Sequence, residues 1–274
     1  MKWLQLLFPL ALFAIMIASC DHVSYTPYGT SVDEEYEDTT AKNVARLLAA
    51  SEGDDELRIA LIGDPQRQFD TSKQFVAAIN QRDDIDLVIV LGDLTNYGLR
   101  DEYETVVDIY SQLRVPWLTV VGNHDILGKG EYLYARVFGD QNHVVDYNDI
   151  RLVFFNSNGR HAEDAAPNFI WLRENTAVDE RNFTQAVVFS HIPPTSRSIA
   201  RTDAQRDEVQ ELFTKTLLSS GKVNLTLHGH LHVFEEQDLG TDEIFSLVVD
   251  TPDDANYVIA TLTADDYEIE RVFF

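Results

Sequence analysis

Apolar positions along this chain alternate between short continuous runs and helix-spaced stretches, starting at residue 57. The run Asp-Leu-Val-Ile-Val-Leu at 86–91 is apolar at nearly every position, which is typical of a strand buried on both faces. The stretch 101–113 instead spaces its apolar side chains by three and four, as an amphipathic helix does. The pattern predicts strands at 57–62, 86–91, 117–121, 185–189 and 223–227, and helices at 71–82, 101–113, 131–138, from 167 onward and at 203–219.

The pattern changes twice along the chain. Residues 144–147 and 151–155 read as a hairpin. After residue 232 four consecutive strands are expected without helices between them, at 233–236, 244–249, 256–263 and 267–274. Alternation followed by a meander predicts an α/β domain built as a four-layer α/β/β/α sandwich, with two mixed sheets face to face and helices outside.

The first 20 residues read as an export signal. One lysine precedes an apolar run that is shorter than the ~20 residues of a membrane-spanning helix and ends in small residues. The ending Ile17-Ala18-Ser19-Cys20 resembles the lipobox of bacterial lipoproteins, in which the cysteine is lipidated and becomes the first mature residue. We expect an exported lipoprotein of the bacterial cell envelope, anchored to a membrane through Cys20. The alternative is an incidental cysteine after an ordinary signal peptide.

The expected domain organisation follows from these features. Residues 1–19 form the lipoprotein signal peptide, 20–56 the lipidated cysteine, an acidic tether and a short helix at 41–50, and 57–274 the folded domain. Because Cys20 is the only cysteine, a disulfide framework is excluded. The net charge of −25, which becomes −26 once Lys2 is removed with the signal, argues against specific nucleic-acid binding, since that needs Lys and Arg to neutralise phosphates.

Residues able to bind metal ions follow five of the predicted strands. Functional sites of α/β sheets gather beyond the carboxyl ends of the strands, so these segments are expected to meet. A single Gly-Asp pair is often only a turn, but the recurrence at the same end of five strands favours a site. The segments are Gly63-Asp64-Pro65-Gln66, Gly92-Asp93-Leu94-Thr95-Asn96, Gly122-Asn123-His124-Asp125, Ser190-His191-Ile192-Pro193 and Gly229-His230-Leu231-His232.

These five segments resemble, in order, the motifs of the calcineurin-like metallophosphoesterases, and the resemblance covers about residues 57–272. It implies a centre of two divalent metal ions bridged by Asp93, with His124 as a catalytic residue near the leaving group. The first ion would be held by Asp64, Gln66, Asp93 and His232, and the second by Asp93, Asn123, His191 and His230.

The resemblance also implies a reaction. A phosphoester substrate, mono- or diester, would be hydrolysed by a hydroxide that bridges the two ions, which also neutralise the phosphoryl charge. Mixed carboxylate, amide and imidazole ligands suit Mn, Fe, Zn or Co, and the sequence leaves the metals open. The motifs leave the alcohol side of the substrate unspecified.

Two positions depart from the family pattern. Gln66 stands where histidine is usual, and we expect it either to be a weaker ligand or to hydrogen-bond a bound water. Asn96 stands where an aspartate often orients the catalytic histidine, so we place Asn96 in the second shell and consider Asp125 a catalytic residue that could take over this role. His228 is expected to be a second-shell or strand-end residue.

Two further expectations concern a polar loop and an alternative function. Asn158, Arg160 and His161 are expected in a solvated loop. Gln66 and Asn96 favour an alternative, a non-catalytic phospho-ligand-binding lipoprotein that retains the metallophosphoesterase fold. The presence of His124 favours the enzyme, since a binder would not need it.

Overall fold

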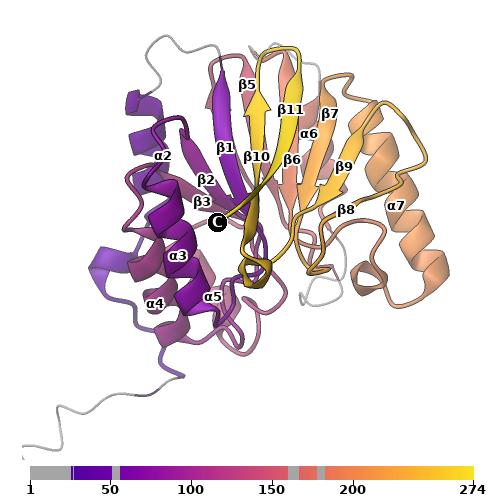
Figure 1. The fold of residues 1–274 in the computed structure, drawn as a ribbon. Coiled ribbons are helices and arrows are strands. Elements are labelled where there is room, and N and C mark those ends of the chain that lie inside the picture. Colours follow the sequence, from indigo (N-terminus) through magenta and orange to yellow (C-terminus); the bar gives the residue numbers. More distant parts are fainter. Residues whose placement is uncertain (1–25, 27, 51–55, 160–166, 178–182) are drawn as a thin grey trace, which may run out of the picture.

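The computed structural model describes residues 26, 28–50, 56–159, 167–177 and 183–274. Its strands form two mixed sheets that pack face to face (Figure 1). The first sheet has the order β11-β10-β1-β2-β3, and the second has the order β4-β5-β6-β7-β9-β8. The strands of the first sheet are β1 (Leu57–Ile62), β2 (Leu87–Val90), β3 (Trp117–Thr119), β10 (Asn256–Leu262) and β11 (Tyr267–Phe273). Those of the second are β4 (His143–Tyr147), β5 (Ile150–Phe155), β6 (Gln185–Ser190), β7 (Val223–His228), β8 (Glu235–Glu236) and β9 (Phe245–Val248).

The two helical layers complete the predicted four-layer sandwich. Residues of α3, α4 and α5 share a core with one face of the first sheet, and residues of α6 and α7 share another with the outer face of the second. Between the sheets lies a third core, into which Leu61 of β1, Phe189 of β6 and Leu227 of β7 all point. The helices are α2 (Thr39–Ala50), α3 (Phe69–Ile79), α4 (Arg100–Tyr110), α5 (Gly130–Val137), α6 (Phe169–Thr176) and α7 (Asp203–Leu218).

The directions of the strands decide where the site can form. Strands β1, β2 and β3 run parallel, as do β5, β6, β7 and β9. Parallel strands end at the same edge of a sheet, so each sheet gathers its carboxyl-end loops along one edge. The site segments leave from β1, β2 and β3 in one sheet and from β6 and β7 in the other.

The C-terminal strands do not form the simple meander that the sequence predicts. Strand β9 pairs parallel to β7 in the second sheet, whereas β10 pairs antiparallel to β1 in the first. Strands β8 and β9 pair antiparallel in the second sheet, and β10 and β11 form an antiparallel hairpin in the first. The chain therefore crosses from the second sheet to the first after β9. Leu247 of β9 and Val258 of β10 are both buried in the core between the two sheets.

The acidic stretch before α2 also differs from the prediction of a solvated spacer. Val32 is 7% exposed and belongs to the core that α3, α4 and α5 build. Glu37 forms an ion pair with Arg136 of α5, and the Asp38 N–H donates to the Arg136 carbonyl oxygen at 3.3 Å. The acidic residues Asp33, Glu34 and Glu35 are exposed as predicted, but one apolar side chain and these contacts fix residues 32–38 to the domain.

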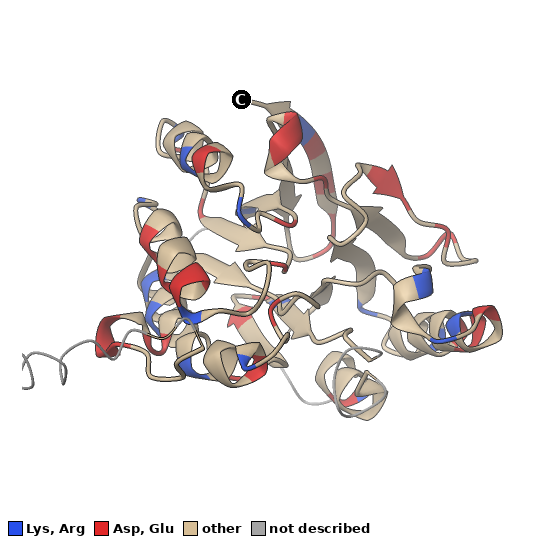
Figure 2. Cartoon of the chain, turned by 90° about the horizontal axis from the view of Figure 1, so that it is seen from below, with Lys and Arg blue, Asp and Glu red and all other residues tan. Residues whose placement is uncertain are grey.

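Two properties of the described residues bear on partners. Within them, no helix is both long and apolar enough to cross a membrane. Figure 2 shows Asp and Glu positions spread over helices and strands, with Lys and Arg interspersed on the helices. This distribution offers no basic stripe in the described part of the chain of the kind that tracks a nucleic-acid backbone.

Candidate metal centre

The predicted ligands from both sheets converge on His191. Its Nε2 atom lies 3.3 Å from Asp93 Oδ1 and 3.8 Å from Asp64 Oδ1. The same nitrogen lies 3.1 Å from Asn123 Oδ1 and 3.3 Å from His230 Nδ1. One donor atom each from Asp93, His191 and His230 fall within 4.8 Å of one another, a spacing that a single ion can bridge. The structure thus brings together residues that the sequence separates by up to 166 positions.

The other two predicted ligands lie at the border of this cluster. His232 is half-exposed, with its Nε2 atom 3.4 Å from Asp64 Oδ1. Gln66 lies against Asp93, because its backbone N–H donates to the Asp93 carbonyl at 2.9 Å and its Nε2 donates to Asp93 Oδ2 at 3.4 Å. The two hypotheses for Gln66, that it is a metal ligand or that it hydrogen-bonds a bound water, therefore remain predictions.

An uncommon backbone conformation aims these side chains. Left-handed φ angles occur at five of the seven predicted ligands: Asp64 (41°), Gln66 (39°), Asp93 (50°), His230 (74°) and His232 (53°). Such angles cost an L-residue roughly 1–2 kcal/mol each and persist only where tertiary contacts impose them. Strain collected in this way at the strand ends is typical of a functional site.

Glycine next to the ligands allows the loops to approach. A Cβ atom at Gly229 would lie 2.6 Å from the Leu91 carbonyl oxygen and 2.7 Å from Asp64 Oδ2. The loop after β7 can therefore reach the loops after β1 and β2 only because residue 229 has no side chain. The His230 N–H then donates to Asp64 Oδ2 at 2.7 Å, which fixes this carboxylate.

The two buried carboxylates of the cluster favour the binding of positive charge. Asp64 and Asp93 are 0% and 2% exposed. Burial raises the pKa of Asp64. Burial also acts on Asp93, but the charge and hydrogen bond of His191, together with the backbone N–H and charge of His124, outweigh it and lower the pKa of Asp93. Burial lowers the pKa of His191, but the charges of Asp93 and Asp64 outweigh it and raise this pKa to about 10. A site that holds a proton this strongly on a buried imidazole will also attract a metal cation.

One buried oxygen supports the same conclusion. Among the described residues, Asp64 Oδ1 accepts no hydrogen bond. It faces the ring nitrogens of His232 at 3.4 Å and His191 at 3.8 Å, and both residues are predicted ligands. A buried oxygen without a hydrogen bond is costly, and a metal ion between these atoms would satisfy it. Carboxylate, amide and imidazole donors form a set that transition-metal ions accept. The residues present therefore fit divalent cations.

His124 is held at the edge of the cluster by backbone contacts. Its N–H donates to Asp93 Oδ1 at 2.9 Å, and its Nδ1 lies 2.8 Å from the Asn96 carbonyl oxygen. Its Nε2 lies 4.0 Å from Asp93 Oδ2, and the side chain is 39% exposed. The backbone of Asn96, rather than its side chain, therefore orients this ring.

Asp125 has a different environment from the one that the sequence suggested. Its carboxylate accepts hydrogen bonds from the N–H groups of Gly122 (2.9 Å), Thr95 (2.9 Å) and Leu94 (3.3 Å), and from the Thr95 hydroxyl at 3.0 Å. The hypothesis that Asp125 orients the His124 ring is wrong, because its oxygens are taken up by the loops after β2 and β3. Burial raises the pKa of Asp125 to about 6.

His228 lies away from the donor atoms of the cluster. It is fully buried on β7, with Nδ1 2.8 Å from Ser190 Oγ and Nε2 3.0 Å from Thr226 Oγ1. Its ring is 6.2 Å from that of Phe213 on α7, so it faces the helical layer. Of the two readings that the sequence left for this residue, the strand-end one is confirmed and the second-shell one is not supported.

Sequence reasoning missed the carbonyl that orients His191. Its Nδ1 donates to the Leu91 carbonyl oxygen at 2.7 Å, across the gap between the two sheets. This bond leaves Nε2 to face the cluster, as in many metal-binding histidines. No side-chain type in the sequence signals such a contact, since every residue has a carbonyl.

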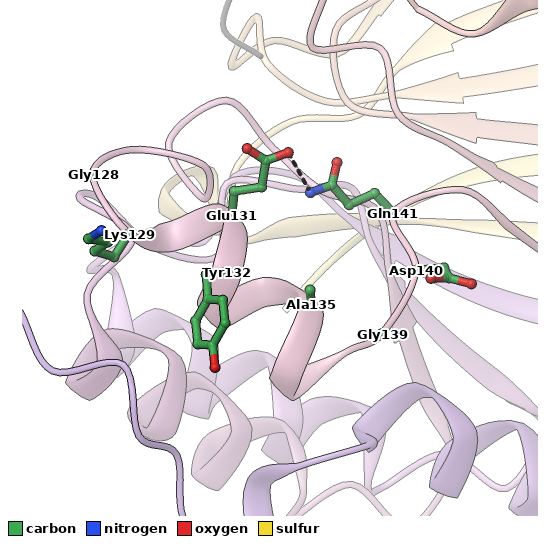
Figure 3. Close-up of a pocket in the computed structure, with 8 residues that line it drawn as sticks. All are labelled: Gly128, Lys129, Glu131, Tyr132, Ala135, Gly139, Asp140 and Gln141. Carbon is green, nitrogen blue, oxygen red and sulfur yellow. Dashed lines mark hydrogen bonds between the residues drawn. The ribbon is translucent and has the colours of Figure 1, made fainter. Parts of the chain in front are cut away.

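One hollow on the described surface is separate from this cluster. It is a cavity of about 520 Å³ around the start of α5, shown in Figure 3. Glu131 and Gln141 form a 3.4 Å hydrogen bond there, and none of the predicted metal ligands line it. Convergence of donor atoms, rather than cavity size, therefore identifies the candidate site. The cavity around α5 is lined by Gly128, Lys129, Glu131, Tyr132, Ala135, Gly139, Asp140 and Gln141.

Curated relatives of the chain include named phosphodiesterases. The chain is 28% identical over 158 residues to a probable glycerophosphodiester phosphodiesterase GpdQ of Arcobacter nitrofigilis, covering 54% of this chain and 56% of the relative. It is 29% identical over 145 residues to a probable cyclic nucleotide phosphodiesterase of Fibrobacter succinogenes, covering 49% of this chain and 54% of the relative. The chain thus spans about half the length of the curated relatives it matches.

Solved structures share the fold at low sequence identity. GAP50, described as the anchor in the inner membrane complex of Plasmodium, aligns with a TM-score of 0.61 at 12% identity over 80% of this chain and 85% of that one. The purple acid phosphatase PPD1 of yellow lupin aligns with a TM-score of 0.55 at 16% identity over 80% of this chain and 51% of that one. A family model described as calcineurin-like phosphoesterase matches residues 57–234. The chain therefore belongs to the calcineurin-like phosphoesterase family.

Proposed function

We propose that this protein is a metal-dependent phosphoesterase that hydrolyses a phosphomonoester or phosphodiester at a centre of two divalent ions. The observation that carries the proposal is the convergence of Asp64, Asp93 and three histidines, with two buried carboxylates, at the ends of strands from both sheets. The phosphodiesterase names of two relatives support a diester substrate.

Each ligand has an assigned place in the proposed centre. Asp64, Gln66, Asp93 and His232 would hold the first ion, and Asp93, Asn123, His191 and His230 would hold the second. Asp93 joins the two sets because its two oxygens face different partners: Oδ1 lies near His191, and Oδ2 lies near Gln66. When bound, two divalent cations supply the positive charge that neutralises phosphoryl oxygens and the acidity that activates a water nucleophile.

His124 supplies the proton for the leaving alcohol. Its Nδ1–H donates to the Asn96 carbonyl, so Nε2 is the atom that exchanges a proton with substrate. The backbone N–H of His124 donates to Asp93 Oδ1, which holds the His124 backbone next to a residue of the metal centre. Proton transfer from a side chain placed in this way contributes typically ~10²–10⁴-fold to a rate.

The alternative function, binding of a phospho-ligand without turnover, is favoured by one observation. The Gln66 amide presents its nitrogen, and not its oxygen, to Asp93. An amide in this orientation adds no donor to the first ion. In this alternative the centre would bind phosphate with the first ion weakly held or absent.

An assay separates the two functions. Purified protein is stripped with a chelator and supplied with Mn²⁺ or Zn²⁺, and release of p-nitrophenol is followed from p-nitrophenyl phosphate and from bis(p-nitrophenyl) phosphate. The enzyme proposal predicts turnover of at least one ester that disappears with chelator and returns with metal. Binding of inorganic phosphate without any metal-dependent turnover would establish the alternative.

We also propose that the protein is an exported lipoprotein, anchored to a membrane of the cell envelope through Cys20. The support is the sequence 1–20 alone, since Cys20 lies outside the described residues. A Cys20→Ser variant is expected to lose incorporation of labelled palmitate and to leave the membrane fraction. Equal incorporation in the variant would refute the anchor.

A further inference from the structure

Two buried polar residues directly after β5 reach both sheets. Ser157 and Asn158 are each 1% exposed. The prediction of a solvated loop is therefore wrong for Asn158, whereas Arg160 and His161 lie outside the described residues. Ser157 Oγ accepts a hydrogen bond from the Ile192 N–H at 2.8 Å, and Asn158 Nδ2 donates to the Val121 carbonyl oxygen at 3.0 Å.

Both contacts lie next to predicted ligands of the second ion. Ile192 directly follows His191, at the end of β6, and Val121 lies two residues before Asn123, after the end of β3. These two ligands come from different sheets, yet Asn123 Oδ1 and His191 Nε2 are 3.1 Å apart. Two adjacent residues thus hold the backbone on either side of this pair.

Contacts of this kind matter because strand pairing does not join β3 to β6; the backbone bond from the Gly63 N–H to the Asp250 carbonyl at 3.0 Å joins the two sheets after β1 and β9 instead. Strand β3 pairs only with β2, and β6 pairs with β5 and β7. The separation of their ends is set by side chains that cross between the sheets, such as His191 to Leu91 and Asn158 to Val121. Because a carbonyl oxygen only accepts, the Asn158 atom that faces Val121 must be its amide nitrogen.

The loop that carries the two residues is itself fixed. The Asn158 N–H donates to Asn156 Oδ1 at 2.9 Å, and the Asn156 N–H donates to Asn142 Oδ1 at 2.8 Å. The Gly159 N–H donates to the Ser157 carbonyl at 2.9 Å. A support that is already rigid can hold metal ligands in place without paying an ordering cost when the metal binds.

From this geometry we propose that Ser157 and Asn158 are positioning residues that set the distance between Asn123 and His191, and thereby the affinity of the second metal ion. The proposal rests on the proposed two-ion centre. Residues that orient metal ligands from outside typically change metal affinity by ~10–100-fold.

The test is a titration of chelator-treated protein with Mn²⁺ by calorimetry. Wild type is expected to bind two ions. Asn158→Ala is expected to weaken one of the two binding events by about 10-fold or more and to leave the other within about 2-fold. Ser157→Ala is expected to shift the same event in the same direction, and it decides the matter if Asn158→Ala does not fold.

Asn43 offers a matched control, because it binds the start of β3, whereas Asn158 binds Val121 beyond the end of β3. Asn43 is 5% exposed, and its Oδ1 accepts a hydrogen bond from the Trp117 N–H at 3.1 Å. Asn43→Ala therefore removes a buried asparagine bound to the start of β3, as Asn158→Ala removes one bound beyond its end. We expect the Asn43→Ala control to lower thermal stability and to leave both Mn²⁺ affinities within about 2-fold. A general loss of stability does not by itself change the distance between Asn123 and His191.

The outcomes are distinguishable. Equal loss of affinity in the Asn43 and Asn158 variants, or wild-type affinity in both the Ser157 and Asn158 variants, overturns the positioning role while the metal centre stands. A wild-type protein that binds no Mn²⁺ or Zn²⁺ overturns the proposed function and this inference together.

Discussion

Replacing Gly122 by alanine should disable the metal centre without unfolding the protein. A Cβ atom at this position would lie 2.0 Å from the Asp93 backbone nitrogen and 2.2 Å from Asp93 Oδ1, whereas ordinary contacts begin near 3.4 Å. The neighbouring atom is backbone, so the loops after β2 and β3 must separate by roughly 1.4 Å, the difference between 2.0 and 3.4 Å. A misplacement of about 1 Å at a catalytic centre can cost ~10²-fold in rate.

The control for this variant is Gly221→Ala, after α7. Gly221 has a φ of +63° with nothing within 4 Å of its Cβ position, so alanine there adds backbone strain of about 1–2 kcal/mol without a clash. Overpacking at Gly122 costs a comparable ~1–3 kcal/mol of stability. We expect metal-dependent kcat/KM to fall by about 100-fold in the Gly122 variant and to change little in the control. A folded Gly122→Ala protein with kcat/KM within about 3-fold of wild type would contradict this prediction.

Three further predictions concern single side chains. His124→Ala should lower kcat by ~10²–10⁴-fold with both metals still bound, as measured by metal analysis, and unchanged turnover would exclude its role. Asp125→Asn should lower the free energy of unfolding by about 1–3 kcal/mol in denaturant titrations. Both carboxylate oxygens accept hydrogen bonds from backbone N–H groups, and in the variant an amide NH₂ would face one of these donors. Burial lowers the pKa of His143 from its ordinary 6.5 to about 4. The unfolded chain therefore binds the extra proton between these values, so stability falls as pH drops from 6.5 to 4, and thermal melts of His143→Phe should show a weaker decline.

The neutral state of His143 has a visible cause. Its ring stacks on Phe154 with centroids 4.4 Å apart, and this burial outweighs the contact of Nδ1 with the Asp140 carbonyl oxygen at 3.1 Å, which raises the pKa. Among the described residues, its buried Nε2 has no hydrogen-bond partner, so a second proton there would be unsatisfied. A pH dependence of stability that is identical in the variant and in wild type would contradict this assignment.

The strand and helix pattern was predictable because it depends on local periodicity. Nearly continuous apolar runs gave the buried parallel strands, and three-and-four spacing gave the helices that cover them. The prediction failed where burial is decided by distant residues. Val32 packs into a core made by helices that follow it in the chain, and β9 and β10 enter different sheets although only a short segment separates them.

Sequence alone determined which residue types gather at which strand ends, since parallel strands place their following loops on one edge. Motifs at five such ends were sufficient to predict the family and a ligand set. The sequence could not show which neighbour holds each ring. The partners of His191 and His124 are backbone carbonyls of Leu91 and Asn96, and any residue type provides a carbonyl.

Tertiary structure alone decided the roles of Asp125 and Asn158. The motif predicted a catalytic role for Asp125, and Asn158 was expected in a solvated loop. Instead, Asp125 binds the backbone of two loops, and Asn158 connects the end of β5 to the loop after β3. The physical reason is that these bonds form between chain segments joined only through the packing of two sheets. Periodicity along one segment carries no information about the distance to another, whereas packing in three dimensions sets it.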